Sequence, residues 1–214
     1  MALSKVNYDS LNVTAAASKA LKWNSSADGF ETGDVAGAMV LLATETASSS
    51  ATISFTSDID DTYDEYIFKF INLHASADGY ISFQGDTGTN TSYNQTITST
   101  FFSAFHDEAD EYPSLTYRTA DDLAQSTSFC KIGFRTGNDD ADMNVCGELH
   151  IFAPSSDTFV KHFYSRFSSY DTGSYACDTY AAGYFNLTTA LTRFQFKMDT
   201  GNIDSGTIKL YGVT

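Results

Sequence analysis

Hydrophobic and polar residues alternate with period two over most of the chain that follows residue 37. In residues 194–198, two phenylalanines and a methionine fall on one face, whereas Gln195 and Lys197 fall on the other. Residues 64–74 repeat this pattern over a longer run. Such alternation predicts strands with one buried face each.

Clusters of Gly, Asn, Asp and Ser separate these runs, and those residues favour turns. The alternation predicts about ten strands, which lie near residues 38–44, 51–55, 64–74, 79–84, 92–105, 127–134, 146–152, 158–167, 180–186, 194–198 and 208–211. One helical turn is expected at residues 120–125. Many short strands with no helical periodicity between them predict an all-β, antiparallel β-sandwich, and we expect a jelly roll.

The N-terminal region does not follow this pattern. Residues 1–22 fit either a short helix or an extended arm, and residues 24–37 read as a polar loop rich in Ser, Asp and Gly. We interpret residues 1–36 as an N-terminal arm or attachment segment, and residues 37–214 as the sandwich domain. The first residues lack the apolar stretch of a secretory leader, so we expect no signal peptide.

The run AMVLLAT at residues 38–44 is apolar almost throughout. A run of this kind is typical of a strand buried on both faces, or of a strand at a subunit contact. It is far too short to span a membrane, so membrane insertion is not expected. Its candidate contact residues are Met39, Val40, Leu41 and Leu42.

Charge and cysteine content narrow the possible partners and cofactors. The formal net charge is −15, from 27 acidic and 12 basic residues. Nucleic acid is not an expected partner, because phosphate binding needs a basic surface. Cys130, Cys146 and Cys177 are widely spaced and lack the spacing of zinc ligands, so we interpret them as small buried apolar residues.

Three acidic loops, at residues 58–65, 106–111 and 138–142, are candidate Ca²⁺ sites, because clustered carboxylate oxygens are the ligands that this ion prefers. The spacing of the loop at residues 106–111 matches neither an EF-hand nor an HExxH helix. Exposed acidic turns explain the same residues, and this interpretation is favoured, so no resident cofactor is expected and Ca²⁺ stays an alternative. The candidate ligands are Asp107, Glu108, Asp110, Asp139, Asp140 and Asp142, with His106 beside the first group.

No catalytic motif is visible in the sequence. His150 and His162 lie in predicted strands, and the chain contains no GxSxG nucleophile elbow. Two acidic loops that face each other would suit glycoside hydrolysis, so a glycan-degrading enzyme stays an alternative. We expect a protein that is not an enzyme.

Four tyrosines lie beside Gly, Ser and Asp in or near predicted loops: Tyr112, Tyr170, Tyr175 and Tyr180. Tyrosines in this setting can stack on sugar rings or pack against a protein partner. They can equally cover the edges of the core or the seams between subunits, and this second interpretation is favoured.

Several segments resemble those of a virion-protein family common in marine bacteriophages. They are GNIDSGTIKLYGV at residues 201–213 with FQFKM before it, YIFKFIN at 66–72, FHDEAD at 105–110, DLAQ at 122–125 and TFVKHF at 158–163. The opening MALSKV resembles the starts of phage tail and fibre-associated proteins. The resemblance implies an oligomeric component of the particle, in a fibre, on the tail or on the capsid surface. It carries over no catalytic residue.

The leading hypothesis is therefore a virion structural protein, made in the host cytoplasm and displayed on the particle beside other virion proteins. By analogy with phage appendages we expect a homotrimer that contacts the host, with a surface glycan as one such contact. The alternative is a carbohydrate-binding jelly roll that uses the loop tyrosines and acidic residues, with or without Ca²⁺.

Overall fold

The computed structural model describes residues 20–33 and 39–213 of the chain. The helix or extended arm expected at residues 1–22 therefore lies almost wholly outside the described residues. The described residues fall into two compact units, a small one that contains the first two strands and a large one that spans Val40–Val213.

The small unit contains an antiparallel hairpin of β1 (Ala20–Trp23) and β2 (Phe30–Gly33). Trp23 and Phe30 are direct partners in this hairpin, and their rings stack with centroids 4.4 Å apart. The expectation of a polar loop throughout residues 24–37 is wrong at β2, because pairing with β1 supplies this polar segment with backbone hydrogen bonds.

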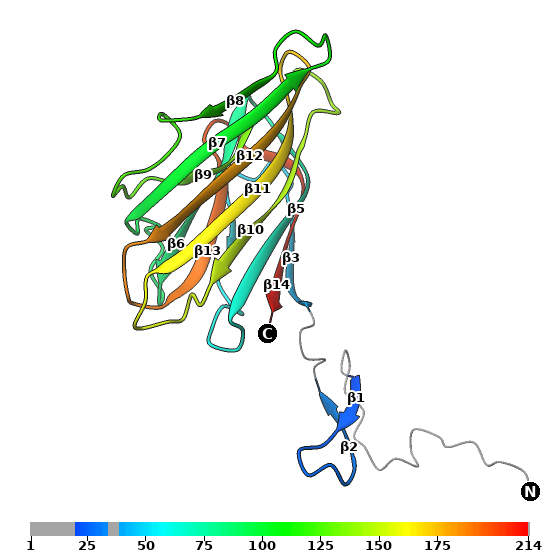
Figure 1. The fold of residues 1–214 in the computed structure, drawn as a ribbon, viewed down its shortest axis with the longest axis vertical. Coiled ribbons are helices and arrows are strands. Elements are labelled where there is room, and N and C mark those ends of the chain that lie inside the picture. The colour runs from blue at the N-terminus through cyan, green and yellow to red at the C-terminus, as the bar shows by residue number, and fades with distance from the viewer. Residues whose placement is uncertain (1–19, 34–38, 214) are drawn as a thin grey trace, which may run out of the picture. The chain divides into compact units, whose positions relative to one another are not determined.

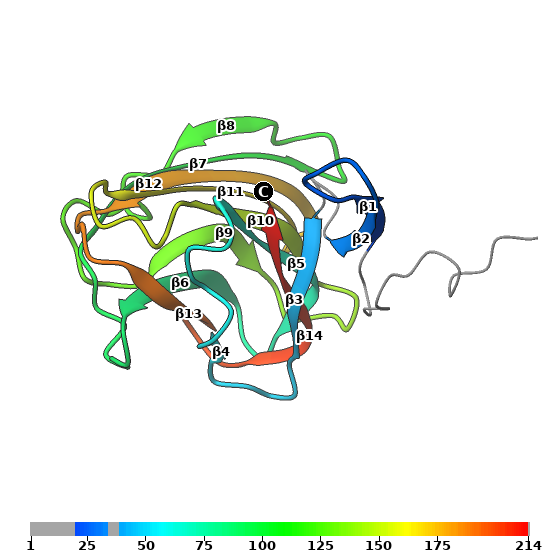
Figure 2. The same ribbon diagram turned by 90° about the horizontal axis from the view of Figure 1, so that it is seen from below.

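The large unit is an antiparallel β-sandwich, which confirms the predicted fold class (Figures 1 and 2). One sheet has eight strands in the order β3-β14-β5-β10-β11-β12-β7-β8, and the other has four in the order β4-β13-β6-β9. The bounds are β3 (Met39–Thr46), β4 (Ile53–Phe55), β5 (Glu65–Ala75), β6 (Gly79–Thr87), β7 (Ile97–Asp107), β8 (Ser114–Tyr117), β9 (Cys130–Thr136), β10 (Val145–Phe152), β11 (Lys161–Asp171), β12 (Tyr175–Phe185), β13 (Leu191–Met198) and β14 (Ile203–Val213).

Consecutive strands alternate between the two sheets from β3 to β7, and again from β8 to β10 and from β12 to β14. The strands β7, β8, β11 and β12 widen the larger sheet on one side. The jelly-roll topology, which is a more specific expectation than the β-sandwich, stays a prediction. No helix that could cross a membrane occurs among the described residues.

The helical turn expected at residues 120–125 is wrong. The segment forms turns and bends that run beside β7. The Ser99 N–H donates to the Leu123 carbonyl, and the Leu123 N–H donates to the Ser99 hydroxyl. Because these backbone groups bond to β7, they are not available for the internal bonds of a helix.

Phenylalanine rings from both sheets form the core. Phe68 of β5 meets Phe194 and Phe196 of β13 with centroids 5.6 and 4.9 Å apart, and Phe83 of β6 meets Phe163 of β11 at 4.9 Å. Aromatic pairs in edge contact add about 0.5–1.5 kcal/mol each beyond the burial of their surface. The phenylalanine-rich composition therefore holds the two sheets together.

The apolar run in β3 is not buried on both faces. Leu42 and Ala43 pack against the core, whereas Met39 and Leu41 are 45% and 51% exposed. The strand forms one edge of the eight-stranded sheet and pairs with β14 alone among the described strands. The expectation that this strand is buried on both faces is therefore wrong for the single chain. The alternative expectation, that the strand lies at a subunit contact, stays a prediction.

Candidate functional site

The candidate binding surface is the face of the eight-stranded sheet that points away from the four-stranded sheet, which we call the outer face. Alternation in β11 shows how the sequence builds it. Phe163 and Phe167 are buried against the other sheet, while Tyr164, Arg166 and Ser168 between and beyond them are exposed. Neighbouring strands continue the same alternation.

A row of directly paired residues crosses the outer face, one residue from each of the strands β14, β5, β10, β11, β12, β7 and β8. In that order the row contains Lys209, Lys69, Glu148, Arg166, Tyr180, Phe102 and Tyr117. One end of the row is charged and the other is aromatic. Cross-strand neighbours of these kinds stabilise a sheet through ion pairs and ring contacts.

The middle of this row is a stack of three side chains. The Arg166 guanidinium lies 5.2 Å from the centre of the Tyr180 ring, and Phe102 stacks on Tyr180 with centroids 5.0 Å apart. Because β11 and β7 flank β12 on opposite sides, the two neighbours cover opposite faces of the Tyr180 ring. Tyr180 therefore has no open ring face on which a sugar could stack.

Asp178 holds the arginine of this stack in place. Nε and Nη2 of Arg166 donate to the two carboxylate oxygens at 3.1 and 2.9 Å, and this contact raises the pKa of Arg166. The charge of Arg166 is thus already neutralised by its own sheet.

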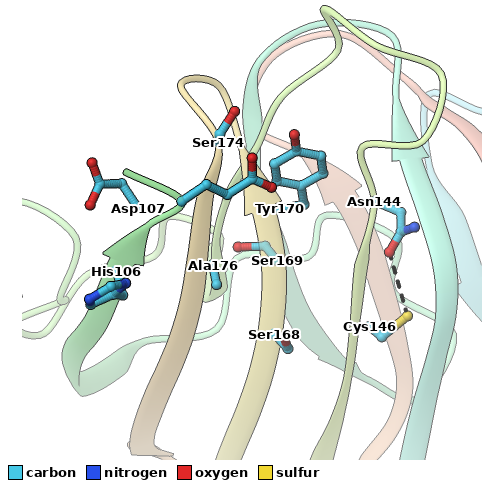
Figure 3. Close-up of a pocket in the computed structure, with 10 residues that line it drawn as sticks. His106, Asp107, Asn144, Cys146, Ser168, Ser169, Tyr170, Ser174 and Ala176 are labelled. Carbon is cyan, nitrogen blue, oxygen red and sulfur yellow. Dashed lines mark hydrogen bonds between the residues drawn. The ribbon is translucent and has the colours of Figure 1, made fainter. Parts of the chain in front are cut away.

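Beside the row, small side chains leave a hollow of about 470 Å³ at one end of β11 and β12 (Figure 3). Ser168 and Ala176 form its floor, and side chains from the ends of β7 and β10 surround it. The hollow is lined by His106, Asp107, Glu108, Asn144, Cys146, Ser168, Ser169, Tyr170, Ser174 and Ala176. It brings together five residues singled out in the sequence: His106, Asp107, Glu108, Cys146 and Tyr170.

Asp107 braces the turn after β7. Its Oδ1 accepts hydrogen bonds from the N–H groups of Glu111 and Tyr112 at 2.8 and 3.0 Å. The Tyr112 N–H, followed by the Glu111 N–H, lowers the pKa of Asp107. This carboxylate is therefore ionised and already occupied by backbone donors, as in other polar turns.

The remaining acidic candidates lie in separate places. Asp110 pairs with Nε2 of His106 at 3.0 Å, and Asp140 accepts a hydrogen bond from the Ala141 N–H. Asp139 and Asp142 share the exposed loop between β9 and β10 with Asp140. Within residues 20–33 and 39–213, no three His, Cys, Asp or Glu side chains are grouped to hold a metal ion. Calcium binding stays a prediction.

The four tyrosines singled out in the sequence do not share one site. Tyr170 lines the hollow, Tyr180 belongs to the stacked row, and Tyr175 lines a different cavity between the sheets. Tyr112 lies in the turn after β7 and is 59% exposed. Their roles as ligand or partner contacts stay predictions.

An aromatic pair that the sequence analysis missed lies farther along the outer face. His150 of β10 stacks on Tyr164 of β11 with centroids 4.4 Å apart, and its Nδ1 contacts a carboxylate oxygen of Glu65 on β5. Burial, followed by the charges of Glu65 and Glu148, raises the pKa of Tyr164. The alternation placed these residues on strands, but the pairing of the strands is what brings them together.

The cysteines divide between the core and the outer face. Cys130 and Cys177 are buried, and burial raises their pKa values to about 12 and about 11. Cys146 is half-buried, because its position on β10 faces outward into the hollow. The interpretation of Cys146 as a buried apolar residue is therefore wrong.

No protein-family model, curated protein or solved structure matches this chain.

Proposed function

We propose that the protein is a structural component of a bacteriophage particle, displayed on its surface and assembled into a homo-oligomer, with a trimer as the expected form. The particle assignment rests on the resemblance of segments that form parts of β5, β7, β11, β13 and β14, and of residues 122–125 before β9. The assembly assignment rests on the edges of the eight-stranded sheet.

The observation that supports assembly is the exposure of aliphatic side chains on both edge strands. Leu115 of β8 is 75% exposed, and Leu41 of β3 is 51% exposed. Soluble proteins usually protect sheet edges with charges, prolines or covering segments. Edges that carry leucine instead suit contact with a neighbouring subunit, and such contacts bury apolar side chains.

The interior suits a subunit that must keep its shape on a particle. The two sheets are joined by a continuous set of aromatic contacts, and most strands are long and paired on both sides. A closely packed core resists deformation because its side chains have few alternative arrangements. The net charge of −15 favours solubility before assembly.

The experiment is to identify the proteins of purified particles by mass spectrometry and then to locate this chain in a cryo-EM map. We expect its sandwich in density at the tail, in a fibre or on the capsid surface. Density at the tail or in a fibre would favour contact with the host. Absence of the chain from purified particles would contradict the proposal.

The second candidate function is carbohydrate binding, and the hollow on the outer face favours it. The hollow combines Tyr170 with carboxylates and hydroxyls, which are groups that bind sugars in concave sites. A glycan array read with and without a chelator tests this function and its Ca²⁺ dependence. A blank array under both conditions would contradict it.

A further inference from the structure

A separate cavity of about 300 Å³ lies between the two sheets. β6 and β9 supply one wall, and β7, β11 and β12 supply the other, with Arg118 after β8 at the side. Its lining residues are Tyr80, Phe105, Arg118, Phe134, Arg135, Asp171, Tyr175 and Cys177. Neither proposed function above uses this cavity, which is distinct from the hollow on the outer face.

Four aromatic rings form most of its wall. Tyr80 meets Phe134 edge to face at 5.3 Å, and Tyr175 meets Phe105 in the same way at 6.0 Å. Apolar walls with a few fixed polar groups are the usual composition of sites for small molecules. A cavity of this size is at the small end of such sites, so it suits a ligand of one ring.

Arg118 is the polar group that singles out this cavity. Its guanidinium carbon lies 4.5 Å from the centre of the Phe134 ring and 5.2 Å from that of Phe105. Nε donates to the Ser103 hydroxyl at 3.0 Å, whereas its terminal nitrogens form no hydrogen bond or ion pair with any described residue. The two phenylalanine rings therefore fix the orientation of the Arg118 guanidinium, and its two terminal nitrogens remain free to donate hydrogen bonds to a ligand.

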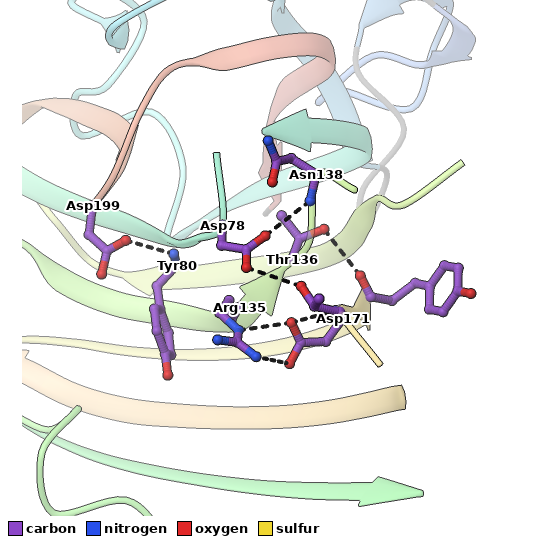
Figure 4. Close-up of polar contacts among 9 residues, drawn as sticks. Asp78, Tyr80, Arg135, Thr136, Asn138, Asp171 and Asp199 are labelled. Atoms are coloured by element: carbon purple, nitrogen blue, oxygen red, sulfur yellow. Dashed lines mark hydrogen bonds and ion pairs between the residues drawn. The ribbon is translucent and has the colours of Figure 1, made fainter. Parts of the chain in front are cut away.

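The other cations around the cavity already have carboxylate partners. Arg135 donates from Nε and Nη2 to Asp171 at 2.9 and 3.1 Å (Figure 4). Lys131, which lies 3.9 Å from the centre of the Tyr80 ring, contacts Asp121. The lining therefore contains two guanidinium groups and one carboxylate, an excess of positive charge in a strongly acidic protein.

We propose that this cavity binds a single sugar ring that carries a carboxylate, such as a uronic acid. The terminal nitrogens of Arg118 match the geometry of a carboxylate, which they would bind through two parallel hydrogen bonds. The aromatic wall faces the apolar side of the ring. The hydroxyls of Tyr80 and Tyr175 make no hydrogen bond with any described residue, so both are free to bind the hydroxyls of a sugar.

Isothermal titration calorimetry with the purified full chain tests the ligand class. The probes are glucuronate and galacturonate, their neutral counterparts glucose and galactose, and benzoate as a ring carboxylate without hydroxyls. We expect the uronates to bind at least about 10-fold more tightly than the neutral sugars, which lack the group that Arg118 would bind. Equal affinity for glucose, or binding of benzoate alone, would overturn the acidic-sugar assignment, as would no uronate binding at about 10 mM.

Two arginine variants test the site itself. Arg118→Gln should weaken uronate binding at least about 10-fold, and Arg118→Lys should weaken it less because it keeps the charge but not the fork. Lys197→Gln is the control for the loss of one positive charge, since Lys197 of β13 lies over the Phe129 ring and lines neither the cavity nor the hollow, and this variant should bind like the wild type. Thermal unfolding verifies that each variant folds.

If Arg118→Gln bound uronate with the affinity of the wild type, the proposed binding site in this cavity would be wrong. If that variant does not fold, Arg118→Lys and Tyr175→Phe give the same decision, because both should lose affinity. These measurements use the isolated protein, so their failure would leave the place of the chain in a particle open, and absence from the particle would leave the cavity site untouched.

Discussion

The buried phenol of Tyr66 shows how a single residue ties a loop to the core. Tyr66 of β5 is fully buried, and its hydroxyl accepts a hydrogen bond from the Asp60 N–H at 3.0 Å and donates to the Asp60 carbonyl at 3.1 Å. Burial raises the pKa of Tyr66 to about 12. The loop before β5 is therefore held by a neutral phenol inside the protein.

Replacement Tyr66→Phe should lower the free energy of unfolding by about 1–2 kcal/mol, because the Asp60 N–H loses its acceptor in a partly buried place. Urea unfolding at pH 7 measures this loss. Tyr112→Phe is the control, since Tyr112 is 59% exposed and its hydroxyl has no partner among the described residues. Equal losses in the two variants would contradict the role of the Tyr66 hydroxyl.

The raised pKa also predicts a pH dependence. An unfolded tyrosine titrates near 10.0, and Tyr66 in the folded protein titrates near 12. Its contribution to stability is therefore complete below pH 10 and is lost as the pH rises from 10 to 12. The stability difference between the wild type and Tyr66→Phe should shrink over this range, and a constant difference would contradict the shift.

At the scale of elements, β14 shows how turn residues can be absorbed into a strand. The alternation predicted strands at residues 194–198 and 208–211 with turn residues between them, but β14 begins at Ile203 and pairs with β5 through two register shifts. Gly206 lies at one of these shifts with a φ of +105°. A β-bulge therefore accommodates residues that favour a turn.

Gly206→Ala should cost more than about 2 kcal/mol of stability, because it combines backbone strain with a steric clash. A Cβ at this position would lie 2.4 Å from the Asn72 carbonyl oxygen. Gly88→Ala is the matched control, since Gly88 has a φ of +55° but open space around the same atom, and it should cost about 1 kcal/mol. Chemical denaturation measures both, and equal losses would mean that the bulge tolerates a side chain.

At the scale of the whole molecule, the edges of the eight-stranded sheet are the surfaces through which we propose that copies of the chain meet. Both edges carry exposed leucines, one on β3 and one on β8. An edge strand also presents unpaired backbone groups that a second chain can bind. Side-by-side contact of sheets from neighbouring copies would satisfy both features.

Leu41→Lys and Leu115→Lys should therefore shift the oligomer toward the monomer, because a charge would be buried in an apolar contact. Native mass spectrometry and light scattering at micromolar concentration measure the change. Phe159→Lys is the control, since Phe159 is 73% exposed in the loop between β10 and β11, away from both edges. A monomeric wild-type protein would contradict the assembly.

The fold class was predictable because its signal is local. The exposed Tyr164 and the buried Phe163 and Phe167 of β11 follow the period that the chain itself shows. The short strands β1, β2 and β8 were not predicted, because they are polar or brief and acquire strand geometry from their partners. The edge position of β3 was not predictable either, since an apolar run does not show whether a strand pairs with a neighbour on one side or on both.

The candidate sites were predictable only in part. The tyrosines and carboxylates near β7 were visible as residue types, and three of those residues line the hollow. The sequence did not identify Arg118 as a site residue. Phe134, whose ring orients Arg118, lies in β9, and the contact between the two forms only when the chain folds. The pairing of His150 with Tyr164 was hidden for the same reason.

By itself, the sequence determined that most of the chain forms strands, which face of each alternating strand is buried, and that the net charge is strongly negative. These properties depend on the order of neighbouring residues, so they are present in every short segment. Tertiary structure alone decided which strands pair, in which register, and which side chains share a cavity. Those properties depend on contacts between distant segments, and a shift of one residue in register would turn each face of a strand over.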